Sequence, residues 1–209
     1  VYKRQHLRGR SGHSSDPALG NSALEGMHRV LGELLRWRAE LQAQNTNPLF
    51  AVPYPTLNLG HIHGGDNPNR ICADCELHID LRPIPGMDLQ ALRATLQARV
   101  QAVIRDSGLE LSCRPLFEGT PAMETPSSSE IVRATETLTG HQAGAVAFGT
   151  EGPYFTQMGI STVVLGPGDI DQAHQPDEYL AEARIPPMLE LLRSLIQRFC
   201  VTPASRCAP

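Results

Sequence analysis

Two neighbouring segments of the chain alternate apolar and polar side chains with the period of a β-strand. The longer covers residues 70–82, and the shorter covers residues 56–63. Turn-forming residues at 64–69 connect them as a hairpin. In residues 70–82 one face is apolar, with Ile71, Ala73, Cys75, Leu77, Ile79 and Leu81. The other face is polar, with Arg70, Asp74, Glu76, His78, Asp80 and Arg82, which predicts a strand with one wet face.

Helical periodicity flanks this hairpin on both sides. Apolar residues from Leu24 to Leu41 recur at helical spacing and predict a helix that starts near Asn21. A second apolar stripe runs from Leu89 to Ile104, after Asp88, which can cap the helix. Short strands at residues 6–12 and 109–113 complete the pattern β-α-β-β-α-β. This order is typical of a ferredoxin-like α+β domain, which we place at residues 6–115.

The remaining residues predict a second segment of α/β type, residues 116–201, and a frayed tail at 202–209. Ser127 and Glu130 fit a capping box, which would open a helix that runs to about Thr139. Apolar runs at Ala143–Phe148 and Ser161–Leu165 suit buried strands. A final apolar stripe from Met188 to Phe199 predicts the last helix.

Composition and charge exclude several classes of protein. The 209 residues are 41% hydrophobic and 19% charged, which is typical of a globular chain. The net charge of −4 leaves no basic excess, so we expect no nucleic-acid partner. No apolar run is long enough to cross a membrane, and no signal peptide is visible at the start. Five cysteines, an odd number, favour free thiols in a cytoplasmic protein.

Two loops carry residues that could do chemistry. His174 lies among acidic residues just after a predicted buried strand, where a carboxylate could orient a metal-binding imidazole. A solvated loop histidine is the alternative. Gly149, Thr150 and Glu151 also follow a predicted strand and offer close backbone approach, a hydroxyl and a carboxylate. Taken alone, an ordinary turn from strand to helix explains this segment better.

Other histidines and cysteines have weaker patterns. His61 and His63 share one strand face near His78, but such pairs are more often surface histidines than metal ligands. Cys72 and Cys75 have the spacing of a zinc or redox motif, yet a strand would turn their sulfur atoms apart. Neither a Gly-x-Ser-x-Gly motif nor a phosphate-binding or dinucleotide-binding glycine motif is present.

A series of motifs along the chain occurs in the order found in one known family. They are SGHSSDP at 11–17, VPYPTLNLGHIHGGD at 52–66, NRIC at 69–72, DLRP at 80–83, and LGPG at 165–168 followed by QAHQPDEY at 172–179. Together these motifs closely resemble the acetylornithine deacetylase family, within the dizinc aminoacylase and desuccinylase superfamily. The resemblance extends from about residue 6 to Phe199.

The resemblance implies a metal-dependent amide hydrolase. The reaction would convert N2-acetyl-L-ornithine and water to L-ornithine and acetate in arginine biosynthesis. The cofactor would be Zn²⁺, two ions per complete subunit, with Co²⁺ as an alternative metal. Residues 6–115 would form a lid that makes a homodimer, and residues 116–201 the C-terminal part of the catalytic domain.

The resemblance also implies that the chain is a C-terminal half and is inactive alone. The H-x-D motif, bridging Asp and Glu-Glu pair of the family's N-terminal half are not found here. Residues 1–5 do not resemble the family's strand that enters the lid. A related enzyme, succinyl-diaminopimelate desuccinylase, is a rival whose loop differs from residues 172–178. A non-catalytic dimerising or ligand-binding module is the second alternative.

Three residues are matched to roles at the metal or across the dimer. His174 corresponds to the family's one C-terminal zinc ligand. His13 corresponds to a lid histidine that reaches the partner subunit's site and stabilises the oxyanion. Asn69 corresponds to a lid residue that also crosses to the partner's substrate. The histidines at 61, 63 and 78 match no ligand of the family.

Four further residues are matched to substrate contacts. Arg82 corresponds to the arginine that pairs with the substrate carboxylate, a bidentate interaction suited to a guanidinium. Gly149 and Thr150 correspond to backbone and hydroxyl contacts near the substrate. We expect Glu151 to bind the cationic side chain of ornithine, because a carboxylate suits an ammonium group.

Overall fold

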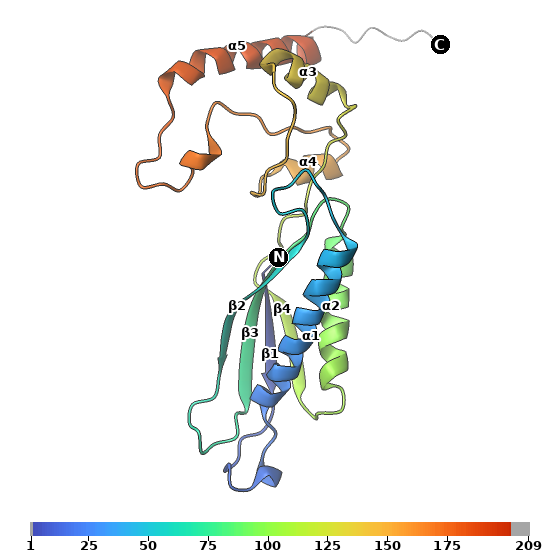
Figure 1. The fold of residues 1–209 in the computed structure, drawn as a ribbon, viewed down its shortest axis with the longest axis vertical. Helices are drawn as coiled ribbons and strands as arrows, with labels where there is room; N and C mark the ends of the chain where they lie inside the picture. Colours follow the sequence, from blue (N-terminus) through green and yellow to red (C-terminus); the bar gives the residue numbers. More distant parts are fainter. Residues whose placement is uncertain (1, 202–209) are drawn as a thin grey trace, which may run out of the picture. The chain divides into compact units, whose positions relative to one another are not determined.

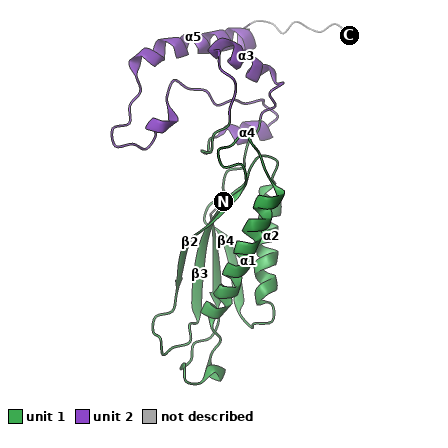
Figure 2. Cartoon of the chain, viewed as in Figure 1, with its two compact units in different colours: residues 1–124, 145–150 green, residues 125–144, 151–209 purple. Residues whose placement is uncertain are grey.

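The computed structural model describes residues 2–201, and the expected tail at 202–209 lies outside the described residues. The chain divides into two compact units, drawn in different colours in Figure 2. Unit 1 comprises Val1–Glu124 and Ala145–Thr150, and unit 2 comprises Thr125–Gly144 and Glu151–Pro209. None of the described helices is both long enough and apolar enough to span a bilayer.

Unit 1 is a four-stranded antiparallel sheet with two helices on one face (Figure 1). The strands lie in the order β2-β3-β1-β4, so β2 and β4 are the edges. This arrangement confirms the predicted ferredoxin-like α+β fold. Its elements along the chain are β1 (Tyr2–Arg8), α1 (Ala23–Gln44), β2 (Thr56–Gly64), β3 (Asp74–Arg82), α2 (Leu89–Ile104) and β4 (Glu110–Pro115).

The core of unit 1 lies between the inner face of the sheet and the helices. The predicted apolar positions of β3 are buried, and none is more than 2% exposed: Cys75, Leu77, Ile79 and Leu81. They pack with the buried side of α1, including Leu34 and Trp37. As predicted, Asp88 caps α2, because its Oδ1 accepts a hydrogen bond from the Ala91 amide at 2.6 Å.

An ion-pair network around the buried Glu33 joins the two helices. Glu33 on α1 is only 7% exposed, and its Oε1 lies 2.8 Å from Nη1 of Arg99 on α2. Arg99 also pairs with Glu40, and Arg36 pairs with Glu33. A carboxylate that loses this much water needs such partners, so the network fixes α2 beside α1.

Two strand boundaries differ from the prediction. The first strand is predicted at residues 6–12, but β1 begins at Tyr2 and ends at Arg8. Its inward positions include Lys3 and Gln5, at 8% and 0% exposure, and two inward polar side chains hide the alternation in the sequence. The start of β3 is Asp74 instead of residue 70. Ile71 instead donates its amide hydrogen to the Gly12 carbonyl at 2.8 Å.

Unit 2 is built from helices and irregular segments. Its helices are α3 (Glu130–Thr139), α4 (Gly152–Gln157) and α5 (Ile185–Ile196), the last followed by a π-helical turn at Gln197–Val201. Short 3-10 turns lie at Ile170–Gln172 and Glu182–Arg184. The predicted helices near residues 130–139 and 188–199 are therefore confirmed in position.

Other predictions for residues 116–201 are wrong. Ala143–Phe148 and Ser161–Leu165 form no strand in the described structure. A strand needs a hydrogen-bonded neighbour, and the described residues place none beside these runs. The N-cap of α3 is Ser129, whose side chain makes no capping hydrogen bond in the described structure, so the capping box of Ser127 and Glu130 is not formed.

We predict that Leu34→Ala destabilises unit 1 strongly. Leu34 is fully buried in the core, so its truncation removes apolar contacts and leaves a cavity, at a cost of about 2–5 kcal/mol. The matched control is Leu19→Ala, because Leu19 is 51% exposed and should change stability by less than about 0.5 kcal/mol. Urea unfolding followed by circular dichroism measures both. Equal losses would contradict the packing of α1 against the sheet.

Candidate functional site

His13 and Asn69 come together from two loops at one end of unit 1. The Ser14 amide donates a hydrogen bond to the Asn69 carbonyl at 3.0 Å. His13 also pairs with Arg70 in an isolated antiparallel bridge. The two residues that the resemblance assigns to the partner subunit's site are therefore held side by side by backbone hydrogen bonds.

The hydrogen bonds of His13 define which ring nitrogen carries the proton. Nδ1 lies 2.7 Å from the Ser15 hydroxyl oxygen and accepts the Ser15 amide hydrogen at 3.3 Å. Because an amide can only donate, Nδ1 is the acceptor and the neutral ring carries its proton on Nε2. The imidazole is exposed, so Nε2–H is a donor that an anionic group could use. No motif in the sequence indicates this positioning role for Ser15.

Arg82 lies at the opposite end of β3 from this loop pair. Its Nε donates to Oδ2 of Asp80 at 2.8 Å, which orients the guanidinium. The nine residues of β3 span about 26 Å at the usual rise of a strand. Asn69 precedes β3 and Arg82 ends it, so one copy of unit 1 does not present both residues to the same small molecule.

The segment of residues 149–151 leads into α4. A Cβ added at Gly149 would meet no heavy atom within 4 Å among the described residues, so the backbone is open to close approach there. Glu151 occupies the N-cap position of α4, and its carbonyl accepts the Tyr154 amide hydrogen at 3.0 Å. Its carboxylate is exposed and makes no capping bond in the described structure. The substrate roles of Gly149, Thr150 and Glu151 stay predictions.

His174 has an unusual backbone conformation. Its φ of 62° makes it the one non-glycine among the described residues with a positive φ. Such strain is found most often where a loop must aim a side chain. The His174 amide donates to Oε2 of Glu178 at 3.1 Å, which holds the turn. The imidazole is exposed on this loop, as a metal ligand in an open site would be.

His174 has no second metal-ligating side chain grouped with it in a cluster of three among the described residues, so it could supply a single imidazole ligand and no more. Within residues 2–201, no group of three or more potential ligand side chains includes His174. Among the described residues, the one such group joins His61, Glu76 and His78, on the sheet of unit 1. The sequence pattern indicates the two histidines as neighbours but does not link them to Glu76.

The cysteines do not supply a metal centre in the described structure. Cys72, Cys75, Cys113 and Cys200 are free thiols. Burial raises the pKa of Cys75 to about 11, and the nearby Cys72 and Glu76 add to the shift. Cys75 is therefore a neutral thiol at physiological pH and a poor metal ligand. Cys72 donates instead to the Asp74 carbonyl at 3.0 Å.

Comparison with known proteins gives two curated relatives. The chain is 48% identical over 194 residues to an acetylornithine deacetylase of Edwardsiella ictaluri, and 45% identical over 194 residues to that of Pasteurella multocida. Each alignment covers 93% of this chain and 50% of the relative, so the chain spans about half the length of these proteins.

A solved structure and a family match agree with this fold. A tripeptidase from Staphylococcus aureus superposes with a TM-score of 0.66 at 16% identity, over 94% of this chain and 50% of that one. Residues 4–107, nearly the whole βαββα part of unit 1, match the family described as peptidase dimerisation domain. The chain therefore contains, at residues 4–107, a domain that matches the peptidase dimerisation domain family.

Proposed function

We propose that this chain forms part of an enzyme that hydrolyses N2-acetyl-L-ornithine to L-ornithine and acetate, in arginine biosynthesis. The observation that carries the proposal is the identity of 45–48% over 194 residues to proteins named acetylornithine deacetylase. The chain would supply the lid and the C-terminal part of the catalytic domain. The four free thiols among the described cysteines favour a cytoplasmic location.

The proposed active site combines residues from two subunits. His13 and Asn69 would act on the substrate bound by the partner subunit. Arg82 would bind the carboxylate of the substrate in the other of the two active sites. Their placement at opposite ends of β3 supports this division, because a single lid does not bring them to one small molecule. The match of residues 4–107 to a dimerisation domain supports it independently.

In this proposal, the chain's own residues bind the metal ion and stabilise the oxyanion. His174 would be one protein ligand of Zn²⁺, which, when bound, lowers the pKa of a water molecule and polarises the acyl oxygen. His13 would donate its Nε2–H to the oxyanion that develops on the amide carbonyl, an effect worth about 3–4 kcal/mol in comparable sites. The other zinc ligands and the general base would come from outside the described residues.

We predict that Arg82→Lys damages catalysis although it keeps the charge. Lysine loses the planar fork, and loss of a charge-assisted hydrogen bond costs about 1.5–3 kcal/mol. In the full-length enzyme, kcat/KM for acetylornithine should fall roughly ten- to a hundredfold. The control is Arg8→Lys, since Arg8 is exposed on β1 and pairs with Asp74. Wild-type kcat/KM in Arg82→Lys would refute the carboxylate role.

We predict that Glu151 discriminates substrates by charge. Glu151→Gln in the full-length enzyme removes the carboxylate that would face the ornithine ammonium, and keeps the size of the side chain. Its kcat/KM should therefore fall about tenfold for acetylornithine and little for an uncharged acetyl amino acid, as expected for one charge-assisted contact. Losses of equal size on both substrates would indicate a structural role at the start of α4 instead.

We predict that the 209-residue chain dimerises but does not hydrolyse acetylornithine. A catalytic zinc needs about three protein ligands, and within residues 2–201 the proposed site offers His174 alone. Pairing is favoured by the edge strand β2 and by Leu24 and Leu35, exposed on one face of α1 three turns apart. Light scattering should give twice the 22.8 kDa chain mass.

The same preparation, assayed with added Zn²⁺, should release no ornithine. Turnover would mean that the chain holds a complete site and that our ligand assignment is wrong. A monomer across the accessible concentration range would contradict assembly through the lid, and would favour the alternative of a simple ligand-binding module.

A further inference from the structure

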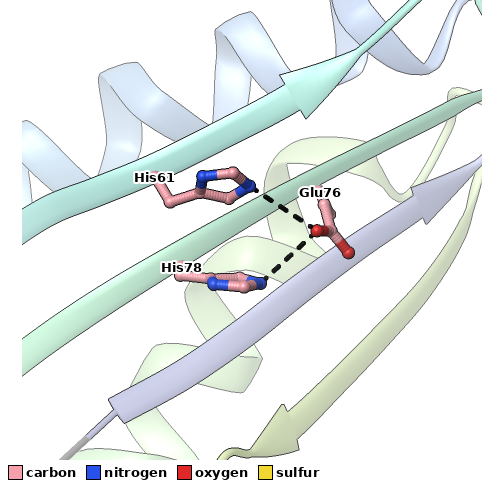
Figure 3. Close-up of side chains that lie close together, drawn as sticks. All are labelled: His61, Glu76 and His78. Atoms are coloured by element: carbon pink, nitrogen blue, oxygen red, sulfur yellow. Dashed lines mark ion pairs between the residues drawn. The ribbon is translucent and has the colours of Figure 1, made fainter.

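Three side chains converge on the outer face of the sheet, away from the helices. His61 on edge strand β2 lies directly opposite His78 on β3, with ring centroids 4.7 Å apart. Glu76 is two residues before His78 and shares its face. Figure 3 shows both imidazoles pointing toward the Glu76 carboxylate. The cluster therefore combines two neighbouring strands in one patch.

A β-bulge in β2 brings His61 to this patch. Leu57 and Leu59 are in register with Leu81 and Ile79, whose side chains face the core. Regular pairing would continue with His61 opposite Leu77, on that inner face. The register shifts between Leu59 and His61, so that His61 lies opposite His78. Bulges are features that redirect a side chain, and this one places an imidazole beside Glu76 and His78.

The distances within the cluster suit a shared metal ion. Nε2 of His61 is 3.7 Å from Oε1 of Glu76, and Nε2 of His78 is 3.5 Å from the same oxygen. The three donor atoms all lie within 4.8 Å of one another. Ligands of a tetrahedral zinc ion with normal bond lengths are about 3.4 Å apart. Small side-chain rotations would bring all three donor atoms to that spacing.

His78 gives a second and independent indication. Its Nε2 is buried and makes no hydrogen bond among the described residues; its one charged neighbour is Oε1 of Glu76, at the ion-pair distance of 3.5 Å. A buried polar atom without a partner is costly, and a metal ion would satisfy it. The His61 side chain is 51% exposed, which leaves a path for an ion from solvent.

The charged residues around Glu76 contact its carboxylate without occupying Oε1, the oxygen that faces the two histidines. Arg4 on β1 approaches the other oxygen of Glu76, with Nη1 3.9 Å from Oε2. His6 and Arg8 are directed to Asp74, at 2.8 and 3.7 Å. Asp80 pairs with Arg82 at the end of the strand. Oε1 of Glu76 is therefore the oxygen that faces the two histidines.

We propose that His61, Glu76 and His78 form a binding site for a divalent transition-metal ion of the zinc class. Two imidazoles and one carboxylate suit Zn²⁺ or Co²⁺, whereas Ca²⁺ and Mg²⁺ prefer an all-oxygen set. The fourth position faces solvent and would hold water. By joining β2 to β3, the ion clamps the edge of the lid sheet.

Zn²⁺ titration of the 209-residue chain, followed by calorimetry, tests this site. The wild type should bind Zn²⁺ saturably, and His61→Gln and His78→Gln should each weaken that binding at least about tenfold. His28→Gln is the matched control, because His28 is an exposed histidine on α1. His174→Gln is the second control, since that residue is our proposed catalytic ligand. Both controls should bind as the wild type does.

A second measurement separates loss of the site from loss of the fold. Zn²⁺ should raise the thermal midpoint of the wild type and of both controls, but not that of His61→Gln or His78→Gln, each with an unchanged far-ultraviolet spectrum. Co²⁺ should give visible absorption without a thiolate charge-transfer band. Wild-type affinity in both site variants, loss of binding in His174→Gln, or a thiolate band would overturn the proposal.

Discussion

Burial of one face of β3 under α1 and α2 is the interaction on which the rest of unit 1 depends. The strand lies between β2 and β1, and its inward side chains are almost fully removed from water. Since side chains in a strand alternate, this burial also fixes the outward direction of Glu76 and His78. The chemistry of the outer face is thus positioned by an apolar core on the other side.

Secondary structure could be predicted from the sequence where the hydrophobic period of a strand or helix repeats over many residues. The alternation in residues 74–82 and the stripes of α1 and α2 predicted these elements because each is amphipathic along its whole length. Prediction failed at β1, where Lys3 and Gln5 face inward, and at Ala143–Phe148, where an apolar run has no strand beside it in the described structure. The local pattern of hydrophobic residues does not show that a polar side chain points into the core. It also does not show whether a second strand is present to pair with an apolar run.

The candidate sites show the same limit at the level of single residues. Motif resemblance named His13 and Asn69 separately, but their contact depends on hydrogen bonds between distant loops, such as that from Ser14 to Asn69. The Ser15 hydroxyl that orients His13 was visible only as a neighbour in sequence. Likewise, strand periodicity placed Glu76 and His78 on one face, whereas a bulge of one residue decides where His61 lies.

The length of β3 places a further constraint on the proposed lid. A strand of about 26 Å separates the loop pair of His13 and Asn69 from Arg82, and a small amino-acid derivative cannot bridge that span. Residues at both ends can serve one substrate only when two copies of the lid meet with opposite ends together. Dimerisation would then be a requirement for a complete site. A metal ion shared by His61 and His78 would keep β2 aligned with β3, and would thereby preserve the distance between the His13 and Asn69 end of the sheet and the Arg82 end.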